Sequence, residues 1–99
     1  MRIYISGPIT GTSDYMERFQ KVEEKLISEG HMVYNPAHAN MYMPEGTTHK
    51  EYMKISFTIL DMAEAIYLMK GWETSRGANQ EYGYALAKGY TIMEEDYEQ

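Results

Sequence analysis

Two features close together in the second half of the chain carry residue types that can do chemistry. Ser75, Arg76 and Gly77 bring a hydroxyl, a guanidinium and a glycine to the start of an expected helix, a set that can hold a phosphate or a carboxylate. An ordinary cap formed by Ser75, with Arg76 in solvent, explains the same pattern equally well. Glu81 follows one turn later. A carboxylate near a helix N-terminus is stabilised as the anion, so Glu81 can serve as a nucleophile or base, although a surface glutamate is the competing interpretation.

A second candidate segment lies near the N-terminus. Gly7-Pro8-Ile9-Thr10-Gly11 follows strand-like sequence and leads into a helix, so its backbone amides can face an anion. It matches neither a dinucleotide fingerprint nor a Walker loop, and a tight strand-to-helix turn is the simpler explanation. Tyr4 shares a strand face with Ser6 by alternation, and core packing explains it as well as a role in a site does.

The cysteine and histidine content excludes several kinds of site. The 99 residues include no cysteine, which rules out a disulfide framework, a thiolate zinc site and a cysteine nucleophile. His31, His38 and His49 share no metal-ligand spacing, so we expect surface histidines and no metal. His38 is the weakest case because it follows a strand end. The sequence implies no cofactor.

The charge balance argues against polymeric partners. Fifteen acidic and nine basic residues give a net charge of −6, and the basic residues are scattered, whereas a nucleic-acid binder needs a basic face. The longest apolar stretch, Ala65–Met69, is far shorter than the ~20 residues of a membrane-spanning helix. We expect no signal peptide, because Met1-Arg2 leads straight into strand-like sequence. We therefore expect a cytoplasmic protein that binds neither nucleic-acid polymers nor membranes.

Ten tyrosines and nine methionines are the unusual part of the composition. They suit an adaptable apolar interior and a surface that associates, and a small domain gains burial by association. We therefore expect a homodimer or a larger homo-oligomer. The predicted contact is the helix from Thr48 to Asp61, because Met53 and Phe57 fall outside its apolar stripe of Tyr52, Ile55, Ile59 and Met62. A dedicated aromatic binding box is the alternative role for the tyrosines.

Hydrophobic periodicity predicts strands that alternate with helices. The expected strands are Arg2–Ser6, His31–Tyr34, Ala65–Met69 and Tyr90–Met93. The expected helices run from a capping box at Asp14 and Glu17 to Gly30, from Thr48 to Asp61, and from Ala78 to Lys88. Residues 37–47 are expected to be an irregular loop of the kind that covers binding sites.

This order predicts a three-layer α/β/α sandwich in a single domain spanning residues 1–99. Its sheet would be parallel, Rossmann-like or flavodoxin-like, with about four strands and right-handed crossovers. Ligands of such sheets bind outside the carboxyl ends of the strands. This rule selects residues 7–12, 35–38 and 70–77 and the helix start after Gly77, which include both candidate segments.

Three segments also match a known family. Residues 3–11, IYISGPITG, and residues 80–89, QEYGYALAKG, correspond to its opening and to its second signature. On these residues the chain resembles the nucleoside 2-deoxyribosyltransferase superfamily. Residues 65–78, AIYLMKGWETSRGA, are similar to a small, mostly uncharacterised branch found in phages and bacteria. The resemblance runs from residue 2 to about 93.

The resemblance implies cleavage of the N-glycosidic bond of a deoxyribonucleotide or deoxyribonucleoside by a retaining mechanism. Glu81 would be the nucleophile at the anomeric carbon, and Tyr4 would hydrogen-bond and orient it. In related deoxynucleoside 5′-monophosphate N-glycosidases, the loop like residues 7–11 and a serine at the position of Ser75 hold the 5′-phosphate. Arg76 and Gly77 would add to that site here.

Two departures from the family pattern leave the activity open. The family aspartate that assists the leaving base corresponds to Ser56, which has no carboxyl proton to give, and such assistance is typically worth about 10²–10⁴-fold in rate. We also expect no C-terminal extension of the kind with which family transferases complete a neighbouring subunit's site. We therefore expect a hydrolase rather than a base-exchanging transferase. The alternative is a non-catalytic protein that binds or sequesters a nucleotide signal.

Overall fold

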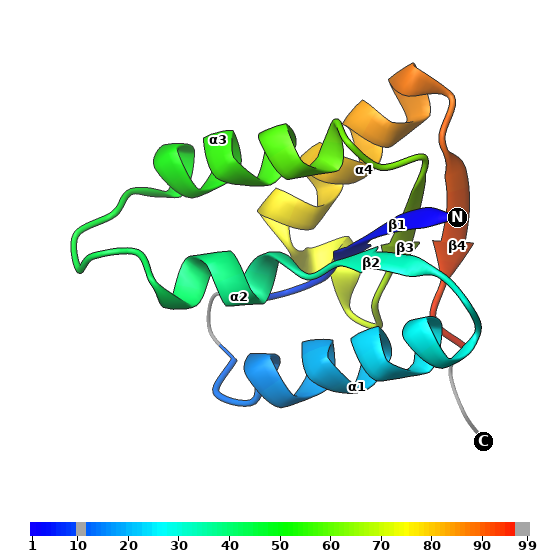
Figure 1. Cartoon of the computed structure of the whole chain (residues 1–99). Helices are drawn as coiled ribbons and strands as arrows, with labels where there is room; N and C mark the ends of the chain where they lie inside the picture. Colours follow the sequence, from blue (N-terminus) through cyan, green and yellow to red (C-terminus); the bar gives the residue numbers. More distant parts are fainter. Residues whose placement is uncertain (10–11, 97–99) are drawn as a thin grey trace.

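A four-stranded, fully parallel sheet forms the middle layer of the structure, a computed structural model that describes residues 1–9 and 12–96 (Figure 1). Its spatial order is β2-β1-β3-β4, with strands β1 (Arg2–Ser6), β2 (Met32–Tyr34), β3 (Ala65–Leu68) and β4 (Thr91–Glu94). β1 and β3 are the central pair, in register from Ile3–Ala65 to Ser6–Leu68. The predicted α/β fold with a parallel sheet of about four strands is confirmed.

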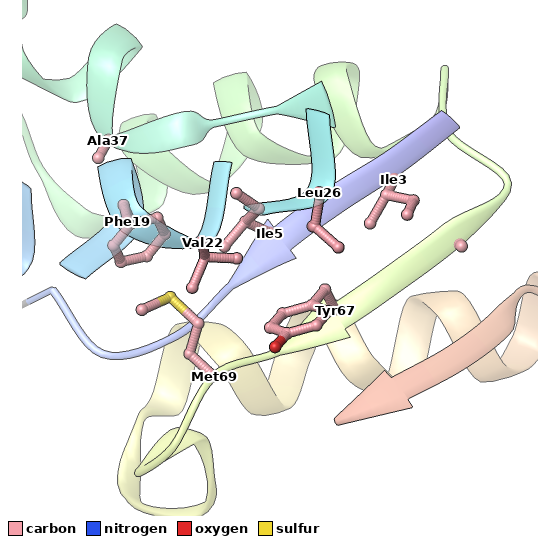
Figure 2. Close-up of a cluster of buried hydrophobic side chains, with 9 residues drawn as sticks. Ile3, Ile5, Phe19, Val22, Leu26, Ala37, Tyr67 and Met69 are labelled. Atoms are coloured by element: carbon pink, nitrogen blue, oxygen red, sulfur yellow. The ribbon is translucent and has the colours of Figure 1, made fainter. Parts of the chain in front are cut away.

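Helix α1 (Tyr15–Ser28) covers one face of the sheet (Figure 1). Its apolar residues recur at helical spacing and are buried, as the sequence predicts. Figure 2 shows them packed over the sheet side chains that point to this face. This cluster comprises Phe19, Val22 and Leu26 of α1 together with Ile3, Ile5, Ala37, Ala65, Tyr67 and Met69.

Helices α3 (His49–Leu60) and α4 (Arg76–Lys88) cover the opposite face (Figure 1). Because side chains alternate along β1, Tyr4 and Ser6 both point to this face, as predicted. The apolar cluster here comprises Tyr4, Leu60, Ala63, Ile66, Leu68 and Ala85. Both faces of β3 are therefore covered, which explains its unbroken apolar run.

The segment expected to be an irregular loop contains a helix, so that prediction is wrong in part. Helix α2 (Pro36–Met41) is capped by Asn35, whose side chain accepts a hydrogen bond from the Ala37 amide, and Pro36 fits its first turn. A short 3₁₀ turn, η1 (Trp72–Thr74), also precedes α4. Within the described residues, no helix is long and apolar enough to cross a membrane.

The capping box predicted at the start of α1 is also wrong. Asp14 caps no backbone amide; its carboxylate instead accepts a hydrogen bond from Arg18 Nε at 3.2 Å. A capping box does occur at the start of α3, where Thr48 and Glu51 bond to each other's backbone amides. It fixes the first turn of α3, which borders the site described below.

The buried stripe of α3 differs from the predicted one. Met53, Ser56 and Leu60 are buried, whereas Met62 is exposed. The predicted stripe is rotated because Ser56, a polar residue, occupies the centre of the buried face. Phe57 does not project from the fold, since its ring packs 5.3 Å from that of Tyr84. The predicted contact between subunits assumed that Met53 and Phe57 face outward, and the burial of Met53 and the packing of Phe57 on Tyr84 remove that basis.

Candidate active site

A cavity of about 290 Å³ opens at the carboxyl edge of the sheet, where the strand-end rule places ligands. Its volume is close to the lower limit for small-molecule sites. Its walls come from the residues that follow β1, from α1, α2 and α3, and from the N-terminal half of α4. The lining residues are Gly7, Ile9, Tyr15, Phe19, Pro36, Asn40, His49, Tyr52, Met53, Ser56, Ser75, Gly77, Ala78 and Glu81.

Glu81 is the central polar group of the cavity. It lies on the second turn of α4 and is only 6% exposed. The Ser6 hydroxyl donates to its Oε1 at 2.6 Å, and the Tyr4 hydroxyl donates to its Oε2 at 2.8 Å. Since both donors come from β1, the strand fixes the orientation of the carboxylate. The interpretation of Glu81 as a surface residue is excluded.

Burial dominates the ionisation of this pair. Loss of hydration raises the pKa of Glu81 from 4.5 to about 7, although hydrogen bonds from Ser6, Tyr4 and Ser56 favour the anion and lower it. Burial, followed by the charge of Glu81, raises the pKa of Tyr4 well above its ordinary value. Tyr4 therefore stays protonated and remains a donor. A carboxylate that titrates near neutral pH in an enclosed site is typical of nucleophiles and bases.

Ser56 lies beside this pair on α3. It is 5% exposed, lines the cavity, and lowers the pKa of both Tyr4 and Glu81 through hydrogen bonding. The residue that corresponds to the family aspartate thus borders the candidate nucleophile. Its hydroxyl supports the charge of Glu81, and it has no carboxyl proton to transfer.

The start of α4 supplies the next part of the wall. The Ser75 hydroxyl accepts the Ala78 amide at 3.1 Å, which is the ordinary cap considered from the sequence, and Ser75 also lines the cavity. Its hydroxyl hydrogen remains available to a ligand. Gly77 also lines the cavity, and a Cβ there would lie 3.3 Å from Met53 Sδ. Arg76 is exposed and lies outside the lining residues.

The loop after β1 contributes Gly7 and Ile9 to the cavity wall. A Cβ at Gly7 would lie 2.8 Å from Met69 Cβ, so only glycine allows this close approach of the β1 and β3 ends. Pro8 is not among the lining residues, and its carbonyl accepts a hydrogen bond from Arg18 Nη2 at 3.2 Å. The predicted binding residues Thr10 and Gly11 lie outside the described residues.

Sequence reasoning missed His49 and Asn40 among the polar residues of the cavity. His49, expected to be a surface residue, is exposed and also lines the cavity. Its spacing of seven from Ser56 is two helical turns and could have indicated a shared face. Asn40 falls in the segment expected to be irregular, and its buried Oδ1 has no hydrogen-bond partner among the described residues. A buried acceptor of this kind suits a ligand donor.

The titratable groups do not form a metal site. Across residues 1–9 and 12–96, no three His, Asp or Glu side chains are grouped closely enough to hold a metal ion. The cavity instead offers a carboxylate with two fixed donors, a capped helix start and several neutral hydrogen-bonding groups. Such a set can hold a small polar molecule against a nucleophile or base.

Comparisons with known proteins give a sequence family and a structural neighbour. The sequence model of the family described as "Domain of unknown function (DUF4406)" matches residues 1–94. The structure is similar to that of a 2-deoxyribosyltransferase from the psychrotolerant bacterium Bacillus psychrosaccharolyticus, with a TM-score of 0.75 over 95% of this chain and 71% of that chain. Because the two sequences are 18% identical, this likeness shows a shared fold. A comparison with curated proteins finds no match.

Proposed function

We propose that this chain, which belongs to the family described as "Domain of unknown function (DUF4406)", cleaves the N-glycosidic bond of a deoxyribonucleotide or deoxyribonucleoside. The family description names no activity, so the proposal is drawn from the site. One observation carries the proposal: Glu81 is a buried carboxylate in the cavity wall, held by the hydroxyls of Tyr4 and Ser6. The shared fold with a 2-deoxyribosyltransferase supports the substrate class.

Glu81 performs the first chemical step in this proposal. One of its oxygens forms a bond to C1′ of the deoxyribose as the bond from C1′ to the base nitrogen breaks, which leaves a glycosyl-enzyme and a free base. Water then attacks C1′ and releases Glu81, so the configuration at C1′ is retained overall. Partial desolvation suits the carboxylate to attack, and Tyr4 and Ser6 keep it aligned.

A 5′-phosphate would occupy the start of α4. Ser75 and Gly77 line the cavity there, the loop at Gly7 and Ile9 closes it, and the helix end favours an anion. Arg76 adds positive charge from the first turn of the same helix. Calorimetry with a nucleotide and its nucleoside tests this site in Arg76→Ala and in Ser75→Gly, which removes the hydroxyl at a capping cost of only a few tenths of a kcal/mol. We expect both variants to lose the preference for the nucleotide.

The central experiment is incubation with a panel of deoxynucleosides and their 5′-monophosphates, with free base measured by chromatography. We expect base release by the wild type and none by Glu81→Gln, with binding of the nucleotide retained. Glu24→Gln, an exposed carboxylate on α1, is the matched control and should keep full activity. Addition of methanol should give a methyl glycoside of retained configuration. Turnover by Glu81→Gln equal to that of the wild type would exclude this mechanism.

A second candidate function is binding of a nucleotide without chemistry. The observation that favours it is that a serine, Ser56, stands at the position of the family acid. Glu81 is then the only carboxylate among the described residues that line the cavity, and no second carboxyl group is there to protonate the base. In this case calorimetry shows binding, chromatography shows no base release with any member of the panel, and Glu81→Gln binds as well as the wild type. Ser56→Asp would then be expected to create activity.

The same panel separates hydrolysis from base exchange. A second free base added to the reaction becomes part of a new nucleotide only if it can attack the glycosyl-enzyme in place of water. We expect deoxyribose 5-phosphate or deoxyribose as the main product, and a new nucleotide would identify a transferase.

A further inference from the structure

The side chain of Asn40 carries a polar atom that the folded chain leaves unpaired. Asn40 lies near the C-terminal end of α2 and lines the cavity. Its Oδ1 is buried, and no donor among the described residues reaches it. A buried acceptor without a donor is costly, so such an atom needs an explanation in the structure. Because Asn40 lines the cavity, a donor on a bound molecule can supply the missing hydrogen bond.

Helix α2 and helix α4 lie on either side of the end of β1. In the sheet order β2-β1-β3-β4, α2 follows β2, and α4 follows β3 by way of η1. α2 packs against both α1 and α3 (Figure 1). Glu81 projects from α4 and is held by hydroxyls of β1. Asn40 and Glu81 therefore belong to facing walls of one cavity.

The two sides of the cavity differ in chemistry. The lining residues from the start of α4 are small or polar. The phenyl and phenol rings of the described lining belong to Tyr15 and Phe19 of α1 and to Tyr52 of α3. Nucleobases stack on rings of this kind. A flat base therefore fits the side of the cavity that holds Asn40, and the sugar and phosphate fit the side of α4.

The proposed reaction gives the bound nucleotide the same orientation. In a displacement at C1′, the nucleophile and the departing base occupy opposite sides of the reacting carbon. Since Glu81 attacks from the wall of α4, the base points away from that wall. A 5′-phosphate at the start of α4 leaves the same side of the cavity for the base.

We propose that Asn40 selects a base that carries an exocyclic amino group, as adenine and cytosine do, and this rests on the function proposed above. The amino group donates to Oδ1 and supplies the bond that the chain itself does not provide. An oxo group at that position would bring a second acceptor against Oδ1 and leave both without a donor. Nδ2 of the same amide can donate to the neighbouring ring nitrogen, the pairing that asparagine makes with adenine in nucleic-acid recognition.

Two pairs of 2′-deoxynucleoside 5′-monophosphates test this selection. Adenine pairs with hypoxanthine and cytosine with uracil, because the members differ in one amino or oxo group and the ring proton that accompanies it. Calorimetry in the Glu81→Gln background measures affinity without cleavage. We expect the amino member of each pair to bind about 10–100-fold more tightly. Asn40→Leu, of similar shape but without polar atoms, should bring the members within about threefold. Met41→Ala, at the adjacent exposed position outside the lining, should keep the preference.

Cleavage rates give a second measurement of the same selection. The bases of a pair leave at different intrinsic rates, so the informative quantity is the change in the ratio of their kcat/KM values caused by Asn40→Leu. We expect this ratio, amino member over oxo member, to fall by about 10–100-fold, while the oxo member alone changes by less than about threefold.

The stability of the chain without nucleotide tests the unpaired acceptor directly. Asn40→Leu removes a buried polar atom that has no partner, so it should unfold at a higher urea concentration than the wild type. A lower urea midpoint would show that the amide supports the fold, and the assignment to the base would fail.

The remaining outcomes separate this proposal from the proposed function. Equal affinities within both pairs would show that the base does not reach Oδ1, and a preference for the oxo members would show that the amide pairs with the ring N–H and oxo group instead. An equal loss for all four nucleotides in Asn40→Leu would place Asn40 at the sugar. Each of these overturns the selection of an amino group. If the wild type releases no base while Glu81→Gln keeps the amino preference, the proposed cleavage fails and the selection by Asn40 stands. If none of the four nucleotides binds, both proposals fail.

Discussion

The buried carboxylate predicts a pH dependence of stability that needs no substrate to measure. Glu81 has a pKa of about 7 in the folded chain and an ordinary value of 4.5 when solvated. Between these values the folded state binds more protons than the unfolded state, so the free energy of unfolding falls as the pH rises. The difference of about 2.5 in pKa corresponds to about 3 kcal/mol, which is lost between about pH 4.5 and pH 7.

Glu81→Gln removes this contribution because the amide does not titrate. The substitution also changes the hydrogen bonds to Tyr4 and Ser6. The part of that change that depends on the ionisation of Glu81 is already contained in its pKa, and the rest is the same at every pH. The informative quantity is therefore the difference between the two free energies of unfolding, followed against pH. Relative to the wild type, Glu81→Gln should gain about 3 kcal/mol between about pH 4 and pH 8.

Urea denaturation at a series of pH values measures this quantity. Glu24→Gln is the control, since its carboxylate is exposed and its substitution should leave the pH profile parallel to that of the wild type. If the difference between Glu81→Gln and the wild type changes by less than about 0.5 kcal/mol over the range, burial does not control the ionisation of Glu81. The assignment of Glu81 as a group poised near neutral pH would then fail.

Three other predictions concern catalysis, packing and assembly. The kcat/KM value should rise with pH through about 7 as Glu81 ionises. Tyr4→Phe removes a hydrogen bond that favours the anion, so the midpoint of this rise in the pH profile of kcat/KM should move to a higher pH by about one unit. Gly7→Ala should lower the free energy of unfolding, measured by urea denaturation, by about 1–3 kcal/mol, because its Cβ would lie 2.8 Å from Met69 Cβ. Gly83→Ala is the helical control: a Cβ there meets nothing within 4 Å, so the free energy of unfolding should rise by about 0.5–1 kcal/mol. The protein should also be at least a dimer at micromolar concentration, and a single-chain mass from light scattering would contradict this.

The sequence predicted the fold because its local signals agree with one another. The β-branched and aromatic residues of β1, the apolar stripe of α1 and the unbroken apolar run of β3 are each typical of one kind of element, and the order of these elements admits few topologies. The errors occur where polar groups replace this pattern. Ser56 is a polar residue on the buried face of α3. The search for apolar periodicity therefore passed over it and placed the buried stripe on Tyr52, Ile55, Ile59 and Met62.

The candidate site was predicted mainly where it follows strand ends and helix starts. Glu81 and Ser75 lie near the start of α4, and the cavity brings them into one wall. Tyr4 lies in the middle of β1, behind that wall, and its place followed from strand alternation and the family resemblance. His49 and Asn40 reach the same cavity from α3 and α2. Their positions depend on how those helices pack across the sheet edge, which no local pattern in the sequence specifies.

The burial of Glu81 links stability to the proposed chemistry. Removal of water from the carboxylate makes its ionised form costly, and the same loss of water leaves that form ready to attack a carbon centre. Two hydroxyls from β1 and one from α3 reduce the cost without giving the carboxylate a permanent cationic partner. A lysine or arginine in their place would stabilise the anion more strongly and weaken it as a nucleophile. The neutral donors around Glu81 are therefore the arrangement expected of a reacting carboxylate rather than of a structural ion pair.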